Sequence, residues 1–386
     1  MEELNASSRP RRTRRTRFVC ISDTHNCTVK LPKGDVLIHC GDLTNQGSFS
    51  ELSKQVQWLE KADFECKIVV AGNHDLTLDT EFYKAHGSYR HNNVSQVPED
   101  CQALLTNSKT LTYLLHESRN IRLTSPSGPR TTFSIFGSPY SPAWGGAWAF
   151  QYPRNEDDNV AAKSLWEEIP LDTDILITHG PAHTHCDESR TQEAAGCEIL
   201  RQEFWRVRPR LALCGHIHEA RGAERVRWDL ESKNARYAEL GRTAWQDPNP
   251  GSEKNALIDL TEKGGAPLDN DGSRCLSDEK SRKEWFDRHR AKLEASGEDG
   301  GDKDVAYPGI GTLGLGEDPD SVRSDQAALA GRLGRRETCI VNCAIQHTSY
   351  PHSGRGPRKL NKPIVVDLDL PVWEDEEPYE KTPEDA

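Results

Sequence analysis

Five short segments of the chain each end a run of apolar, strand-forming residues with side chains that can bind a metal ion. The segments cover residues 23–25, 41–42, 72–75, 178–180 and 215–218. They supply carboxylate, amide and imidazole ligands but no cysteine, which argues against a zinc finger or an iron–sulfur site. Ligands of these kinds for two adjacent divalent cations are typical of hydrolytic metal enzymes.

The apolar runs before these segments alternate with residues of helical spacing. Strands are predicted over 17–22, 35–42, 67–71, 174–177 and 210–214. A helix over 50–61 would place Leu52, Val56 and Leu59 on one face, with Ser50 as its N-cap. This alternation predicts an α/β fold with a partly parallel sheet. Loops that follow the strands are where such sheets build their sites.

The composition changes along the chain and divides it into five parts. Residues 1–16 are predicted to be a disordered basic leader, and residues 17–229 to be the first part of a catalytic domain. Residues 230–335 are rich in glycine, proline and charged residues, which predicts a mostly disordered insertion. Strand character returns in 336–372, the predicted closing strands, and residues 373–386 form an acidic tail.

The net charge and the cysteine content indicate which binding partners and which cellular compartment to expect. The net charge of −12 argues against binding to an extended nucleic acid. The 11 scattered cysteines favour reduced thiols in an intracellular, cytoplasmic protein, although the basic leader leaves the nucleus or an organelle open. No apolar run approaches the roughly 20 residues that cross a membrane. The composition identifies no protein partner for the insertion or the tail.

The order of the five ligand segments resembles a known signature. The motifs are D-x-H at 23–25, G-D at 41–42, G-N-H-D at 72–75, a single histidine at 179 and G-H-x-H at 215–218. This series resembles the calcineurin-like metallophosphoesterase superfamily. The neighbouring residues, including 34–42, 137–139 and 178–181, are most similar to its metallophosphoesterase-domain-containing (MPPED) family. The resemblance implies a four-layer αββα sandwich of two mixed β-sheets flanked by helices.

The resemblance also implies a binuclear metal site. One cation would be held by Asp23, His25, Asp42 and His218, and the other by Asp42, Asn73, His179 and His216. A hydroxide between the cations would attack phosphorus. His74 would be the catalytic residue that stabilises the transition-state oxygens or protonates the leaving group. Manganese is the favoured cation, with iron, zinc and magnesium open because these ligands accept each of them.

Two departures bear on the substrate. Protein Ser/Thr phosphatases carry G-D-x-x-D-R-G, whereas this chain has Asn45 and Gln46 at the Asp and Arg positions. Loss of that arginine disfavours phosphomonoester dianions. The MPPED resemblance implies a phosphodiesterase for cyclic nucleotides or other small phosphodiesters.

Substrate contacts are predicted for Asn45, His183 and Tyr140. The alternative for Tyr140 and the aromatic residues after it is packing in the core, and the alternative for His183 is an exposed loop. Two other functions remain open: a nuclease for short single strands, and a nucleotide-binding or scaffold protein with vestigial catalysis. The intact His216 argues against the scaffold.

Overall fold

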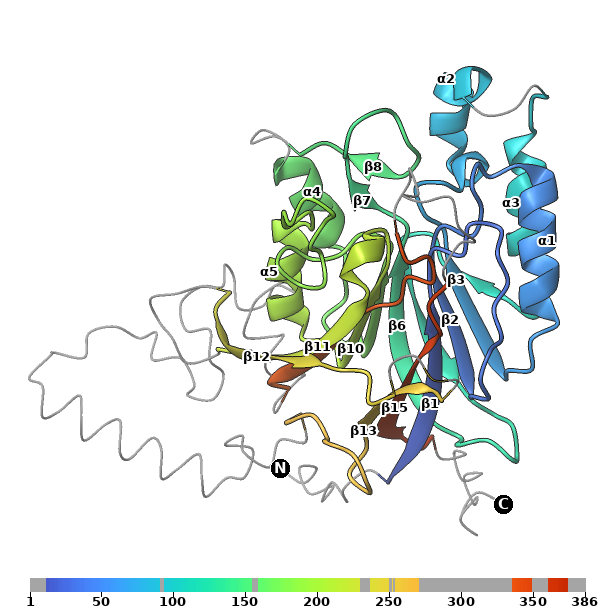
Figure 1. The fold of residues 1–386 in the computed structure, drawn as a ribbon. Helices are drawn as coiled ribbons and strands as arrows, with labels where there is room; N and C mark the ends of the chain where they lie inside the picture. The colour runs from blue at the N-terminus through green and yellow to red at the C-terminus, as the bar shows by residue number, and fades with distance from the viewer. Residues whose placement is uncertain are drawn as a thin grey trace, which may run out of the picture.

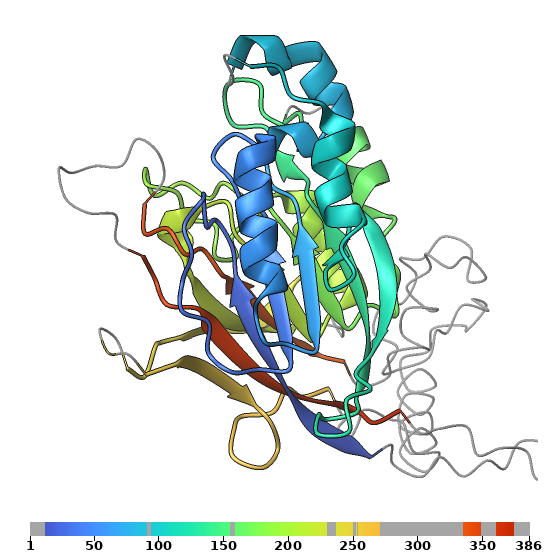
Figure 2. The same cartoon turned by 90° about the vertical axis from the view of Figure 1, so that its right-hand side faces the viewer.

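Two β-sheets pack face to face in the centre of the molecule (Figure 1). A computed structural model of the chain describes residues 12–90, 94–154, 159–229, 237–249, 252, 254–270, 335–348 and 360–373. Helices cover the outer face of each sheet, which gives four layers (Figures 1 and 2). The predicted αββα sandwich is therefore confirmed.

In the described part of the chain, the first sheet has six strands and mixes parallel with antiparallel pairs. In spatial order its strands are β13 (Ala256–Leu260), β15 (Ile364–Pro371), β1 (Thr13–Ile21), β2 (Val36–Cys40), β3 (Cys66–Val70) and β4 (Thr112–Tyr113). β1 to β4 run parallel to one another, and β15 is antiparallel to β1. Every residue of β2 is buried, as expected for a parallel strand covered on both faces.

The second sheet has seven strands among the residues that the structure describes. In spatial order they are β12 (Glu239–Trp245), β11 (Gly222–Trp228), β14 (Glu337–Asn342), β10 (Leu211–Cys214), β9 (Ile175–Thr178), β6 (Thr132–Ser138) and β5 (Glu117–Arg122). β6, β9, β10 and β14 are parallel, and β5, β11 and β12 are antiparallel to their neighbours. A separate two-stranded ribbon joins β7 (Ser141–Pro142) to β8 (Gln151–Tyr152).

Each sheet is covered by its own helices. The first sheet carries α1 (Phe49–Glu60), α2 (Thr80–Arg90) and α3 (Pro98–Thr106), and the second carries α4 (Asn159–Trp166) and α5 (Glu198–Val207). The predicted first helix is present, but its N-cap is Ser48 and not Ser50. Glu51 N donates to Ser48 Oγ, and Ser48 N donates to Glu51 Oε2, which together form a capping box.

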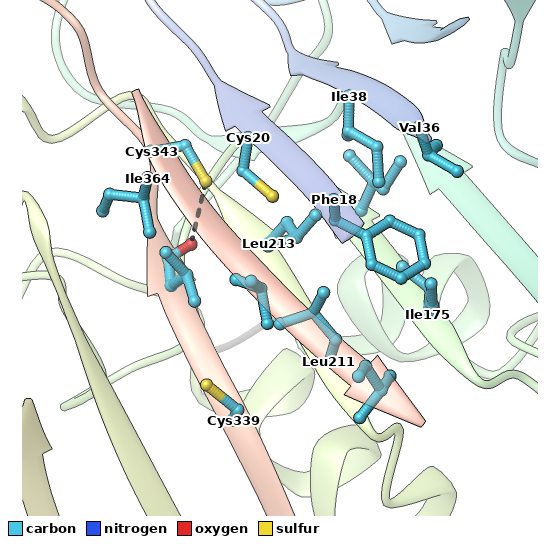
Figure 3. Packing of buried hydrophobic residues seen from close by; sticks show 14 of the residues in the cluster. Phe18, Cys20, Val36, Ile38, Ile175, Leu211, Leu213, Cys339, Cys343 and Ile364 are labelled. Carbon is cyan, nitrogen blue, oxygen red and sulfur yellow. Dashed lines mark hydrogen bonds between the residues drawn. The ribbon is translucent and has the colours of Figure 1, made fainter. Parts of the chain in front are cut away.

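The main apolar core lies between the two sheets. Phe18, Val36 and Ile38 of the first sheet face Ile175 and Leu211 of the second (Figure 3). Two further clusters fill the space between each sheet and its helices. The ten described cysteines are free thiols, and seven of them are buried. No described helix is long and apolar enough to cross a membrane.

The predicted leader is too long by four residues. β1 begins at Thr13, where it pairs with Pro371 of β15. The pairing is reinforced by Arg17, whose Nε and Nη2 donate to the two carboxylate oxygens of Asp367 at 2.7 and 2.6 Å. The end of the basic run is therefore part of a strand. Its partner strand lies about 350 residues away in the chain, so the sequence near residue 13 does not reveal the pairing. Residues 1–11 lie outside the described residues.

The predicted insertion also contains two strands. β12 and β13 lie within 230–335 and extend the edges of the two sheets. β12 is mostly exposed, so it lacks the apolar pattern that would reveal a strand. The strands after residue 335 take inner positions: β14 lies between β10 and β11, and β15 between β13 and β1. Residues 271–334 and 374–386, which include the acidic tail, lie outside the described residues.

Candidate metal centre

Two groups of potential metal ligands lie at the carboxyl ends of the central strands. The Asp23 group consists of Asp23, His25 and His218, and the Asp42 group consists of Asp42, His179 and His216. Within each group, one ligand atom from every residue lies within 4.8 Å of the others. They follow β1, β2, β9 and β10, and these ends meet because the strands are parallel within each sheet.

The Asp42 carboxylate connects the two groups. Its Oδ2 lies 3.4 Å from His179 Nε2 and 3.6 Å from His25 Nε2 of the Asp23 group. Asn73 Oδ1 lies 2.9 Å from His179 Nε2. The structure thus brings six of the seven predicted ligands into the two groups, with Asn73 beside the second. Asp42 has the position that a bridging ligand requires.

The backbone at the site adopts conformations that L-residues rarely take. Positive φ angles occur at Asp23 (53°), His25 (44°), Asp42 (54°) and His216 (68°). Such conformations are unfavourable for residues with a Cβ, and they persist where the surrounding structure enforces them, often at functional sites. Gly41 has φ 101°, and a Cβ there would lie 2.5 Å from His179 Nδ1. Glycine is therefore required before Asp42.

Backbone carbonyls fix the orientation of three imidazoles. His25 Nδ1 lies 3.1 Å from Thr44 O, His179 Nδ1 lies 2.9 Å from Cys40 O, and His218 Nδ1 lies 3.0 Å from Thr348 O. A carbonyl only accepts, so these contacts assign a proton to each Nδ1 and direct Nε2 into the site. His25 Nε2 and His218 Nε2 then face each other at 3.3 Å. With both Nε2 atoms deprotonated, these two residues could hold a cation between them.

The pKa values of the ligand side chains are shifted by burial and by one another. Burial raises the pKa of Asp23, but the nearby His218 outweighs it and lowers that pKa to about 2. Burial lowers the pKa of His25 and of His216 to about 3. The Asp23 carboxylate is therefore ionised, and His25 and His216 are neutral at pH 7, as metal ligands must be. Burial lowers the pKa of His179 and of His218, but Asp42 and Asp23 outweigh it, so that the pKa of His179 rises to about 9 and that of His218 rises above its ordinary value. Cation binding would release a proton from these two imidazoles. The chemistry and arrangement of the donor atoms thus fit two divalent cations.

A second layer of polar contacts holds the ligand loops together. Asp75 is fully buried, and its carboxylate accepts from Leu43 N, Thr44 N and Gly72 N at 3.2, 3.0 and 2.9 Å. It therefore ties the loop after β2 to the loop after β3. Sequence reasoning gave Asp75 no role, although it belongs to the G-N-H-D motif.

Asn342, at the end of β14, positions the last ligand loop. Its Nδ2 lies 2.9 Å from Ile217 O and 3.4 Å from Gly215 O, the residues that flank His216. We expect Asn342→Leu to lower the affinity for Mn²⁺ by roughly 10- to 100-fold, the usual effect of losing an outer contact to a metal site. Calorimetric titration with Mn²⁺ would measure this, with the exposed Asn120→Leu as a control. Equal affinity in Asn342→Leu and wild type would contradict the assigned role.

A cavity of about 740 Å³ opens above the two groups. Its floor contains ligands from both groups together with Asn73 and His74. Its walls are formed by Asn45, Gln46, Trp144, Trp148, Gln151, Ser189, Arg190, Thr191, Ala195, Ile217 and Glu219. The size falls within the range of small-molecule sites. The sequence did not predict that the polar residues 189–191 line a cavity. They lie in a turn, which has no periodic pattern to indicate which side chains face the cavity.

The three predicted substrate contacts lie in different places. Asn45 lines the cavity. Tyr140 does not, and instead makes edge contacts with His116 and Phe150 in the core. His183 also lies outside the lining, where its Nδ1 is 3.3 Å from Glu198 Oε2.

His74 lies on the cavity floor with its ring held on two sides. Its Nδ1 is 2.9 Å from Asn45 O, and its ring stacks on Trp148 with centroids 4.3 Å apart. Its backbone N donates to Asp42 Oδ1 at 2.8 Å. Since the Asn45 carbonyl only accepts, the contact assigns a proton to Nδ1. Nε2 is then the ring atom that can exchange a proton with a substrate.

His185 braces the segment that follows His179. It is fully buried, with Nδ1 2.5 Å from Glu224 Oε1 and Nε2 3.1 Å from Glu239 Oε1. Burial lowers the pKa of His185, but the two hydrogen-bonded glutamates outweigh it and raise the pKa above 6.5. This imidazolium links the segment to β11 and β12.

The raised pKa makes this brace sensitive to pH. A group whose pKa is higher in the folded state stabilises the fold below its unfolded pKa, and the contribution is lost as pH rises through the folded pKa. We expect the thermal unfolding midpoint to fall as the pH rises above the ordinary pKa of histidine, and to fall less in His185→Gln. The exposed His86→Gln serves as the control. The same pH dependence in His185→Gln and wild type would exclude this contribution.

Comparisons with known proteins agree with this geometry. The family model described as calcineurin-like phosphoesterase matches residues 16–220. The chain is 41% identical over 218 residues to metallophosphoesterase domain-containing protein 1 of Homo sapiens, covering 54% of this chain and 62% of that protein. It is 36% identical over 208 residues to a UPF0046 protein of Caenorhabditis elegans, covering 53% of this chain and 64% of that protein.

A third relative has a different name. The chain is 41% identical over 231 residues to the "Probable rhamnogalacturonate lyase C" of Emericella nidulans, which covers 59% of this chain but 20% of that protein. The chain thus spans less than two thirds of each of these three relatives.

Proposed function

The chain belongs to the calcineurin-like phosphoesterase family, and we propose that it is a phosphodiesterase that hydrolyses cyclic nucleotides or other small phosphodiesters. The observation that carries the proposal is the pair of ligand groups joined by Asp42 at the floor of the cavity. Two divalent cations bound there, with Mn²⁺ favoured, would polarise the phosphate and activate a water molecule as nucleophile.

Residues of this chain supply the remaining parts of the reaction. The two ligand groups would hold the cations beneath the phosphate, and His74 would transfer a proton to the leaving oxygen through Nε2. The contacts of His74 with Asn45 O and Trp148 keep the ring in place for that transfer. A ring that is already held in position lowers the entropy cost of the proton transfer.

The aromatic side of the cavity favours a nucleotide. Trp144 is half-exposed and lines the cavity beside Trp148. An indole ring offers a surface on which a base can stack, and such stacking contributes about 1–3 kcal/mol per base. The net charge of −12 also supports a small substrate, because it disfavours contacts with an extended polymer of phosphates. The free cysteines support an intracellular, cytoplasmic setting.

Phosphodiesters are favoured over phosphomonoesters because Gln46 replaces the arginine that would bind a dianion. Gln46 and Asn45 both line the cavity, so the replacement faces the space that a substrate would occupy. The lyase name of one relative does not extend to this chain, since the match covers only a fifth of that protein.

A hydrolysis panel with Mn²⁺-loaded protein would test the proposal. The substrates are 2′,3′- and 3′,5′-cyclic nucleotides, a bis-aryl phosphodiester, an aryl phosphomonoester and a short single-stranded oligonucleotide. We expect the small diesters to be turned over faster than the monoester. Faster monoester turnover would refute the diester preference, and preferred cleavage of the oligonucleotide would favour a nuclease. Fewer than about one tightly bound cation per chain after loading would favour a scaffold with vestigial catalysis.

A further inference from the structure

The cavity carries a positive charge on the wall that sequence reasoning missed. Arg190 is the only arginine or lysine among the described residues that line it. Its neighbours Ser189 and Thr191 also line the cavity and add hydroxyl groups. The carboxylates in the lining are Asp42 and Glu219.

The Arg190 side chain is exposed. Within the described part of the chain, the structure records no ion pair between its guanidinium and a carboxylate. Most exposed arginines are simply solvated. Arg190 differs because it faces a cavity whose floor holds the metal-ligand groups.

The turn that carries Arg190 is built in a defined conformation. Glu188 and Ala194 form an antiparallel bridge, and Gln192 N donates to Ser189 O at 2.8 Å. At its base, the Asp187 carboxylate accepts from Thr184 N at 2.9 Å and from Gly196 N at 2.8 Å. The buried His185 adds its two glutamate contacts just before the turn. The Arg190 backbone is therefore fixed relative to the second sheet.

Arg154 connects this turn to the aromatic wall. Its Nη2 donates to Ala195 O, its Nε donates to Ala143 O at 3.0 Å, and its guanidinium lies 5.1 Å from the Trp144 ring centre. The two walls of the cavity are thereby held as one unit. A ligand that stacks on the Trp144 indole would therefore occupy the same cavity that Arg190 lines.

We propose that Arg190, in the turn after His179, binds a phosphate oxygen of the substrate in the cavity that it lines. The inference rests on the proposed function, because it assumes a phosphate over the two ligand groups. A guanidinium presents two parallel N–H donors that match a phosphate. The ligand class is a nucleoside phosphate, with its phosphate between the cations and Arg190 and its base toward Trp144.

Calorimetric titration of Mn²⁺-loaded protein tests the inference without relying on turnover. The ligands are inorganic phosphate, a non-hydrolysable phosphonate analogue of adenosine monophosphate, and adenosine. We expect Arg190→Gln to bind both phosphate ligands roughly tenfold more weakly, the lower end for a charged hydrogen bond because the side chain is exposed. Adenosine binding should stay unchanged. The phosphate affinity of Arg190→Lys should lie between those of wild type and Arg190→Gln, since lysine keeps the charge but loses the paired donors.

The matched control is Arg122→Gln, on the exposed end of β5 away from the cavity. Its phosphate affinity should equal that of wild type, and all variants should unfold at the same temperature. Unchanged phosphate binding in Arg190→Gln, or an equal loss of adenosine binding, would overturn the inference. If wild type hydrolyses no phosphoester, the proposed function fails, whereas the titrations still decide the role of Arg190.

Discussion

Asp42→Asn should bind at least one cation fewer than wild type and lose phosphodiester turnover by a factor of about 10³ or more. Asp42 Oδ2 lies within 4 Å of an imidazole from each ligand group, and among the described residues it is the carboxylate oxygen with both contacts. Asparagine keeps the shape but removes the negative charge that both cations would share. Bound cations supply several kcal/mol of transition-state stabilisation, which corresponds to at least three powers of ten in rate.

Metal analysis after Mn²⁺ loading and turnover of a bis-aryl diester would be measured on the same preparation. Asp100→Asn is the matched control, because Asp100 is exposed in the first turn of α3. Its metal content and turnover should match wild type. Full metal occupancy in Asp42→Asn would show that this carboxylate does not bridge the two groups.

His74→Asn should reduce turnover by about 10² to 10⁴ while leaving the metal content unchanged. The His74 side chain belongs to neither ligand group, and its contact with Asp42 is made by the backbone N. The substitution therefore removes the proton donor and preserves the ligands. The loss should be smaller for a diester with a good leaving group, such as an aryl oxide, because that oxygen needs less protonation.

This dependence on the leaving group separates catalysis from folding. Turnover of an aryl diester and of a cyclic nucleotide would be compared in His74→Asn, in the exposed His86→Asn and in wild type. A loss of bound metal in His74→Asn would assign His74 a structural role. An equal loss on both substrates would argue that His74 acts on the phosphate oxygens and not on the leaving group.

The positions of the ligand segments were predictable from one physical rule, whereas the assignment of individual residues to two cations came from the resemblance to the metallophosphoesterase signature. Each ligand follows an apolar strand, and the carboxyl ends of parallel strands meet at one edge, so order along the chain implied proximity in space. The apolar pattern of those strands also predicted the central strands of both sheets. It did not apply to β12, whose exposed residues carry no apolar pattern, nor to Thr13–Thr16, which are ordered by a distant partner strand.

The cavity walls were less predictable for a related reason. Side chains that face a substrate need not be buried, so their sequence shows neither helical nor strand periodicity. Arg190 lies in a polar turn that resembles any surface turn until His185 and Asp187 are seen to anchor it. Tyr140 and His183 were predicted contacts chosen by residue type and by nearness to a motif. Their side chains pack elsewhere in the structure.

The position of the strands after residue 335 has a consequence for how the protein is made. His218, the last ligand in the chain, is oriented by Thr348 O, and its loop is held by Asn342. A ribosome adding about 5–20 residues per second needs roughly 7–26 s to pass from one to the other. During that time all seven candidate ligands have been synthesised, but the two sheets still lack inner strands. Cation uptake would thus be favoured only after residue 348 has been synthesised, and a chain that stops between β13 and β14 would carry every candidate ligand without the contacts that orient His218.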